Sequence, residues 1–84
     1  MQVKVLLFGP AAAVAGCESI TVSVVRPASC LDVLCALGAK EPRLKAMTDP
    51  LGGARLAVNH AFATVSQEVT AHDEVALITM VSGG

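Results

Sequence analysis

The sequence has no tryptophan and no tyrosine, and its only aromatic side chains are two phenylalanines. Six lysines and arginines stand against seven acidic residues, which gives a net charge of −1 and leaves no basic stripe. Nucleic-acid binding depends on clustered positive charge and on aromatic side chains that stack on bases, and both features are missing. We therefore expect no nucleic-acid partner.

No apolar run approaches the about 20 residues that a membrane-spanning helix needs. Residues 1–5 lack the basic-then-apolar layout of a signal peptide. Cys17, Cys30 and Cys35 form an odd set without a C-x-x-C pair, so neither a disulfide framework nor a zinc site is expected. We predict a cytoplasmic protein without membrane contact or bound metal, in which the cysteines are small buried thiols.

The sequence contains enough apolar residues to form the core of one packed domain. Of its 84 residues 54% are hydrophobic and only 15% are charged, so a folded core is expected. So few charges leave part of the surface apolar, which indicates a face that a partner covers.

Hydrophobic periodicity predicts one main helix and five strands. Ser29 and Asp32 have the spacing of a capping box at the helix start, and Gly38 marks its expected end. One apolar stripe follows the helical period, made of Cys30, Val33, Leu34 and Leu37. Strands are expected at residues 3–8, 19–25, 55–58, 61–65 and 74–80, short helices at 10–15 and 43–49, and a polar connection at 66–73.

This element order predicts an α+β domain in which a mixed sheet of about five strands packs on one main helix. The first two strands form a hairpin, and the last strand lies parallel beside the first at the centre of the sheet. That is the β-grasp, or ubiquitin-like, roll. The domain is expected to occupy residues 1–80 and to be followed by a flexible tail at 81–84.

The predicted tail reads Val81-Ser82-Gly83-Gly84. Two glycines add nothing to packing, and ordering them costs more backbone entropy than ordering other residues. A thin tail ending in a carboxylate can enter a narrow channel of another protein. Four extended residues reach about 13 Å at ~3.3 Å each.

Four segments of the chain, residues 29–37, 55–59, 73–78 and 81–84, together resemble the MoaD/ThiS group of ubiquitin-like sulfur carriers, and in particular the small subunit of molybdopterin synthase. The Asp73-Glu74-Val75-Ala76 stretch and the Val-Ser-Gly-Gly end carry most of the likeness. Where that family usually has Pro-Pro before the tail, this chain has Thr79-Met80. A different approach angle of the tail is therefore expected.

The resemblance implies that a ubiquitin-activating-type adenylyltransferase uses ATP to adenylylate Gly84. Sulfur from a persulfide enzyme then converts Gly84 to a thiocarboxylate, and Val81, Ser82 and Gly83 thread into the large subunit of a heterotetrameric synthase. There the sulfur passes to cyclic pyranopterin monophosphate in molybdenum cofactor biosynthesis. The chain itself would be a non-catalytic sulfur donor without a bound cofactor, and the large subunit would supply the catalytic groups.

Strand alternation adds a predicted partner interface. Phe8, Phe62 and Ile78, together with Leu6 and Met80, are expected on the sheet face away from the helix. The alternative for these residues is ordinary burial under a loop.

Three other functions remain open from the sequence. They are a sulfur carrier for thiamine or amino-acid synthesis, a protein modifier joined to lysines through Gly84, and an interaction module with an inert tail. His60 and the His72-Asp73-Glu74 run are interpreted as solvated turn residues rather than as metal ligands or acid–base groups.

Overall fold

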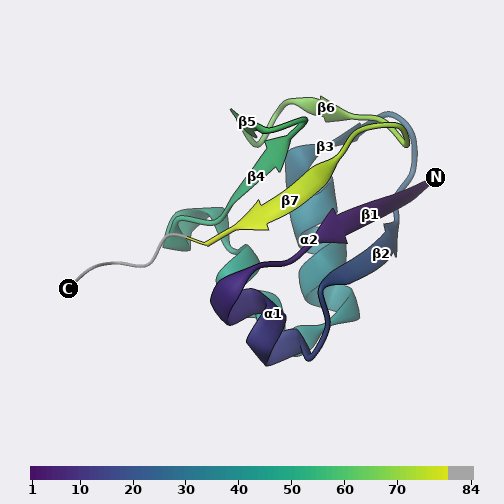
Figure 1. Cartoon of the computed structure of the whole chain (residues 1–84). Coiled ribbons are helices and arrows are strands. Elements are labelled where there is room, and N and C mark those ends of the chain that lie inside the picture. Colours follow the sequence, from purple (N-terminus) through teal and green to yellow (C-terminus); the bar gives the residue numbers. More distant parts are fainter. Residues whose placement is uncertain (80–84) are drawn as a thin grey trace.

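A five-stranded mixed sheet with one long helix across one of its faces forms the body of the protein (Figure 1). The computed structural model describes residues 1–79. β1 and β7 are parallel neighbours at the centre, and the other pairs are antiparallel. This arrangement confirms the predicted β-grasp roll. The strands, in their order across the sheet, are β2 (Ser19–Ser23), β1 (Gln2–Leu6), β7 (Val75–Ile78), β4 (Arg55–Val58) and β5 (Ala61–Ala63).

Helix α2 (Cys30–Lys40) begins at the predicted capping box. The Asp32 backbone N–H donates to Ser29 Oγ at 3.2 Å, and the Ser29 N–H donates to Asp32 Oδ2 at 2.9 Å. The predicted end at Gly38 is wrong, because α2 continues to Lys40. Gly38 instead lies where another segment crosses the helix closely. All members of the predicted apolar stripe are buried, namely Cys30, Val33, Leu34 and Leu37.

The core lies between α2 and the inner face of the sheet. Every second residue of the central strands points into it, and Val5 and Val75 are fully buried. Leu56 of β4 and Leu77 of β7 are register partners, and each is 1% exposed. The helix stripe and the inner sides of these strands thus bury one another, as two-layer packing requires.

Short elements connect the strands and the helix. Helix α1 (Gly9–Ala15) follows β1, with Pro10 in its first turn as predicted. The predicted helix at 43–49 is present as a 3₁₀ helix, η1 (Pro42–Thr48), and a single turn, η2 (Pro50–Gly52), follows it.

A second, two-stranded sheet was not predicted. It pairs β3 (Ala28–Ser29) with β6 (Glu68–Val69), and Val69 is 1% exposed. The segment at 66–73, which was predicted as a polar connection, therefore contributes a strand and one core side chain. Two-residue strands are too short to show alternation, so no hydrophobic pattern indicates them.

The ends of the main strands lie close to the predicted ones. β7 begins one residue later than expected and ends at Ile78. Within residues 1–79, no helix combines the length and apolar character needed to cross a membrane. Met80 and the predicted tail at 81–84 lie outside the described residues.

Candidate functional site

The outer face of the sheet, opposite α2, carries a row of apolar residues. Leu6 of β1 is paired with Ala76 of β7, Ala76 with Ala57 of β4, and Ala57 with Phe62 of β5. Paired residues of neighbouring strands point to the same face, so these four side chains form one band across the strands. Ile78 lies two residues beyond Ala76 and extends the band along β7.

Exposure separates this face from the core. Leu6, Ala57, Ala76 and Ile78 are only half-buried, although their strand neighbours are buried. Phe62 is 72% exposed. We call this group of five residues the apolar outer patch; its members are Leu6, Ala57, Phe62, Ala76 and Ile78.

The predicted interface residues are placed as follows. Leu6, Phe62 and Ile78 share the outer face as expected, and Phe8, which is 57% exposed, follows β1 two residues beyond Leu6. The alternative of burial under a loop does not hold for Phe8 or Phe62. Met80 lies outside the described residues. Whether a partner binds this patch stays a prediction.

The apolar outer patch has a polar border on its β2 side. There Gln2 is paired with Ser23 and Lys4 with Thr21, and Gln2 Nε2 donates to Ser23 Oγ at 2.8 Å. On the other half of this face, from β7 to β5, a positive charge is supplied by Arg55, whose cross-strand partner is Ile78. A surface divided in this way resembles a protein-binding patch with an apolar centre and a polar rim.

The predicted sulfur-carrying residue, Gly84, and the threading residues Val81, Ser82 and Gly83 lie outside the described residues. What the structure defines is the strand that precedes them. β7 lies between β1 and β4, and its last residue, Ile78, is paired with Arg55 of β4 (Figure 1). β7 thus contributes Ala76 and Ile78 to the apolar outer patch and precedes the predicted tail in the chain.

The Asn59 and Asp73-Glu74 motif residues form a structural clamp. Asn59 Nδ2 donates to Asp73 Oδ1 at 3.0 Å, and the Glu74 N–H donates to Asn59 Oδ1 at 2.9 Å. Asp73 Oδ2 also accepts from the Thr70 N–H at 2.7 Å. These hydrogen bonds, first that from the Thr70 backbone and then that from the Asn59 amide, hold the pKa of Asp73 below its ordinary value. The clamp fixes the start of β7 to the β4–β5 turn.

His60 lies at the turn between β4 and β5, next to an acidic side chain. His60 is 85% exposed at a turn with positive φ, and its Nε2 lies 3.0 Å from Glu74 Oε2. In residues 1–79, no group of three or more histidine, cysteine or acidic side chains is arranged to hold a metal ion. The interpretation of His60 as a turn residue is confirmed. Asp73, which was interpreted only as a solvated turn residue, also has a structural role through the hydrogen bonds that it accepts from Asn59 and Thr70.

The cysteines differ in their surroundings. Cys30 is 1% exposed, and burial, followed by the negative charge of Asp73, raises the pKa of its thiol. Cys17 and Cys35 are exposed, so the prediction that all three thiols are buried is wrong for these two. Cys35 lies on the side of α2 that the apolar stripe leaves outside, and Cys17 lies in the loop before β2.

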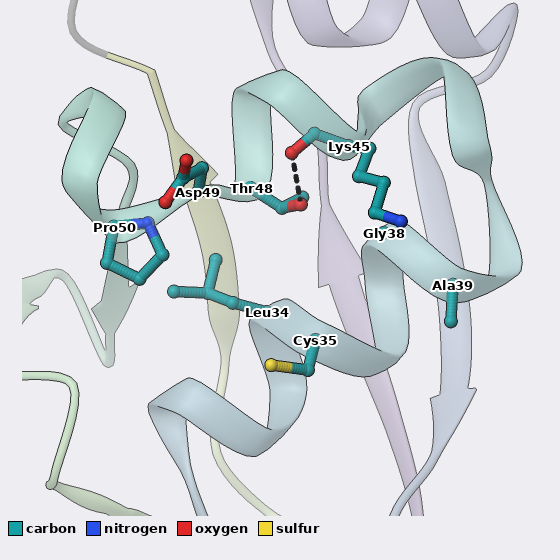
Figure 2. A pocket seen from close by; sticks show the side chains of 8 residues that line it. All are labelled: Leu34, Cys35, Gly38, Ala39, Lys45, Thr48, Asp49 and Pro50. Carbon is teal, nitrogen blue, oxygen red and sulfur yellow. Dashed lines mark hydrogen bonds between the residues drawn. The ribbon is translucent and has the colours of Figure 1, made fainter.

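A hollow of about 380 Å³ lies between α2 and the η1–η2 segment (Figure 2). A Cβ atom on Gly38 would lie 2.7 Å from Thr48 Oγ1, so glycine is what allows η1 to cross the helix so closely. Thr48 Oγ1 donates to the Lys45 carbonyl at 3.0 Å. The hollow is therefore explained by the close packing of η1 across α2 at Gly38. Its lining residues are Leu34, Cys35, Gly38, Ala39, Lys45, Thr48, Asp49 and Pro50.

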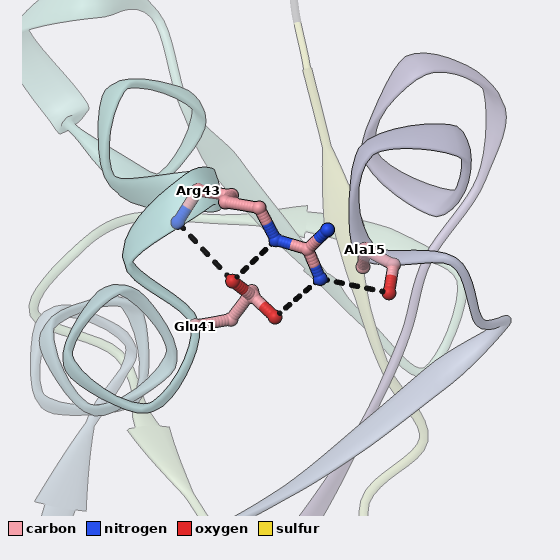
Figure 3. A network of polar contacts seen from close by, with 3 residues as sticks. All are labelled: Ala15, Glu41 and Arg43. Atoms are coloured by element: carbon pink, nitrogen blue, oxygen red, sulfur yellow. Dashed lines mark hydrogen bonds and ion pairs between the residues drawn. The ribbon is translucent and has the colours of Figure 1, made fainter.

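A small polar network joins η1 to α1 (Figure 3). Arg43 Nε and Nη2 donate to the two carboxylate oxygens of Glu41 at 2.9 and 3.0 Å, and Nη2 also reaches the Ala15 carbonyl at 3.5 Å. The hydrogen bonds from Arg43 lower the pKa of Glu41. Because this network is exposed to solvent, we assign it to orientation of the segment rather than to binding.

Comparison with known proteins extends these observations. A family model described as the ThiS family matches residues 5–84, nearly the whole chain. A search of curated protein sequences finds no significant match.

Several solved structures share the fold. SAMP1 from Haloferax volcanii is 29% identical, with 100% of both chains covered and a TM-score of 0.85. The small archaeal modifier protein 1 (SAMP1) from Methanosarcina acetivorans is 24% identical over 99% of this chain and 96% of that one, with a TM-score of 0.79. A chain in the complex of subunits 1 and 2 of the molybdopterin-converting factor from Helicobacter pylori is 22% identical over 100% of both chains, with a TM-score of 0.62.

Proposed function

This chain belongs to the ThiS family, as its motifs predicted, and from that premise we propose that it carries sulfur as a thiocarboxylate on Gly84 for molybdenum cofactor biosynthesis. The observation that carries the proposal is the family match, which runs through a β-grasp domain to the Val-Ser-Gly-Gly segment. Its setting is the cytoplasm, where ATP and persulfide enzymes are available.

The proposed chemistry begins at a Gly84 carboxylate. Its oxygen attacks the α-phosphorus of ATP on an adenylyltransferase, pyrophosphate leaves, and an acyl adenylate forms. A persulfide sulfur then attacks the carbonyl carbon and expels AMP. A thiol cleaves the resulting acyl disulfide and leaves the thiocarboxylate. The carboxylate alone is a poor electrophile, and adenylylation gives it a good leaving group.

The second part of the proposal is sulfur transfer in a synthase. The thiocarboxylate sulfur attacks a carbon of the pterin precursor within the large subunit and displaces an oxygen leaving group from that carbon, which forms a thioester. Water then attacks the carbonyl carbon of the thioester, so the sulfur stays on the pterin and the Gly84 carboxylate is regenerated. The partner supplies the acid and base groups. Holding the sulfur on a docked domain replaces a bimolecular encounter with an oriented one. A relative of this fold is described in a complex of subunits 1 and 2 of the molybdopterin-converting factor, which supports a large-subunit partner.

We assign partner docking to the apolar outer patch. It includes the strand that leads to the predicted tail, so a protein seated on it also has access to residues 81–84. The half-buried members need no rearrangement to be covered, because they already lie in strands of fixed register. Phe62 and Phe8 add the aromatic area in which protein interfaces are enriched.

A second candidate function is that of a protein modifier. It is favoured by one observation, the 29% identity to SAMP1 over the full length of both chains. In that function lysine amines of other proteins, rather than a persulfide, attack the acyl adenylate at Gly84 and form isopeptide bonds. Both functions share the activation step and differ in the nucleophile. A carrier for thiamine or amino-acid synthesis also shares the activation step and differs in the final sulfur acceptor.

The experiment is intact mass spectrometry of the chain, with Gly84 as its last residue, after incubation with ATP, the activating enzyme and a persulfide donor. We expect the mass gained when one carboxyl oxygen is replaced by sulfur, located at Gly84. A variant without Gly84 is the matched control and should gain nothing. Higher-mass lysine conjugates without the thiocarboxylate would select the modifier, and no ATP-dependent product at all would refute both functions.

A further inference from the structure

Arg55, the first residue of β4, places a cation at the edge of the apolar outer patch. Its register partner on β7 is Ile78, and its side chain is exposed. Phe62 is paired with Ala57, the next residue of β4 on the same face. Among residues 1–79 no carboxylate forms an ion pair with Arg55. The cation thus lies between apolar side chains without a charge partner in the described part of the chain.

The guanidinium is held in place by backbone groups. Arg55 Nη1 donates to the Ala54 carbonyl at 2.8 Å and to the Pro50 carbonyl at 3.3 Å. Neither Nη2 nor Nε donates to another described residue, so part of the five-donor guanidinium fork is left for solvent or a ligand. A guanidinium that is anchored in this way loses little rotamer entropy when it binds a carboxylate.

Two hollows flank Arg55. One, of about 390 Å³, lies against Phe62, Ala63 and Thr64, and the other, of about 300 Å³, lies against Pro50 and Leu51. Leu51 is 97% exposed, and no motif or period in the sequence indicates it as a surface contact. Arg55 therefore separates two shallow apolar hollows, each bordered by an exposed large side chain.

We propose that the activating enzyme docks on this face with an aspartate or glutamate carboxylate on Arg55 and with apolar side chains in the two hollows against Phe62 and Leu51. A partner that covered the patch without such a carboxylate would remove water from a charged group and leave it unpaired. Charge complementarity therefore requires a carboxylate on the partner surface that faces Arg55, because arginine forms bidentate hydrogen bonds with carboxylates. This inference rests on the proposed activation of Gly84.

The test is ATP–pyrophosphate exchange by the adenylyltransferase of the same organism, with the full chain as the titrated substrate. We expect Arg55→Glu to raise the KM for the chain about 30-fold, because it sets two carboxylates against each other. Arg55→Lys should give a smaller rise. Arg26→Glu is the matched control, since Arg26 is an exposed arginine in the loop after β2, away from the patch. The wild-type KM should rise with ionic strength more steeply than that of Arg55→Glu.

The inference and the proposed function fail differently. If the wild-type chain supports no exchange, the activation step itself is refuted. If it supports exchange and Arg55→Glu behaves like Arg26→Glu, only the docking inference is overturned. Leu51→Asp serves if Arg55→Glu does not fold, because Leu51 contributes almost no burial to the free domain. Leu51→Asp should also raise the KM, and a wild-type KM for that variant would equally overturn the inference.

Discussion

Replacing Phe62 by alanine should weaken docking strongly and weaken the fold only slightly. Phe62 is 72% exposed, so of the ~150–250 Å² that a phenylalanine can bury, roughly 110–180 Å² remains accessible in the free domain. At ~25 cal/mol per Å², a partner that covers this area gains up to about 3–4 kcal/mol. The KM for activation should therefore rise by about 100-fold in Phe62→Ala.

The same arithmetic bounds the cost to folding. The buried remainder of Phe62, about 40–70 Å², is worth about 1–2 kcal/mol of unfolding free energy. Leu56→Ala should instead lower the unfolding free energy by about 2–5 kcal/mol, because Leu56 is only 1% exposed on the inner side of β4. Urea unfolding measures both losses, and ATP–pyrophosphate exchange measures the KM.

Val25→Ala is the matched surface control, because Val25 is 86% exposed and lies in the loop after β2. It should change neither the KM nor the unfolding free energy appreciably. A Phe62→Ala variant that is as destabilised as Leu56→Ala would show that Phe62 is a core residue. A variant with an unchanged KM would show that the outer patch does not face the activating enzyme.

Two further predictions concern the fold. Gly38→Ala should destabilise by about 1–3 kcal/mol in thermal or urea unfolding, since its Cβ would lie 2.7 Å from Thr48 Oγ1. The double variant with Thr48→Ala should recover part of the loss, and a stabilised single variant would contradict the close crossing. Asp73→Asn should cost about 1 kcal/mol near neutral pH, because it weakens the bonds from Thr70 and Asn59. The pKa of Asp73 is lowered in the fold, so its contribution is present above the ordinary value of about 3.9 and is lost as the pH falls through the lower folded value. Wild type and variant should therefore converge in stability in acid, and a gap that persists there would refute this account.

Local pattern determined the main elements of this protein. The alternation in β1 and β7 and the capping box with its stripe in α2 are properties of neighbouring residues, so the sequence alone predicted the two layers. The element order also predicted that the last strand lies beside the first at the centre of the sheet, which is where β7 lies. The carboxyl-terminal motif was likewise available from the sequence, and it is the basis of the proposed chemistry.

Only the tertiary structure decided which residues share a surface. Register places Phe62 in one band with Leu6, although the two lie far apart in the sequence. The Asn59–Asp73 clamp, the close crossing at Gly38 and the pairing of β3 with β6 all join segments that no local pattern connects. These features join segments that are distant in the sequence. A hydrophobic period of two or of 3.6 residues shows which face of an element is buried, but not which distant segment packs against it.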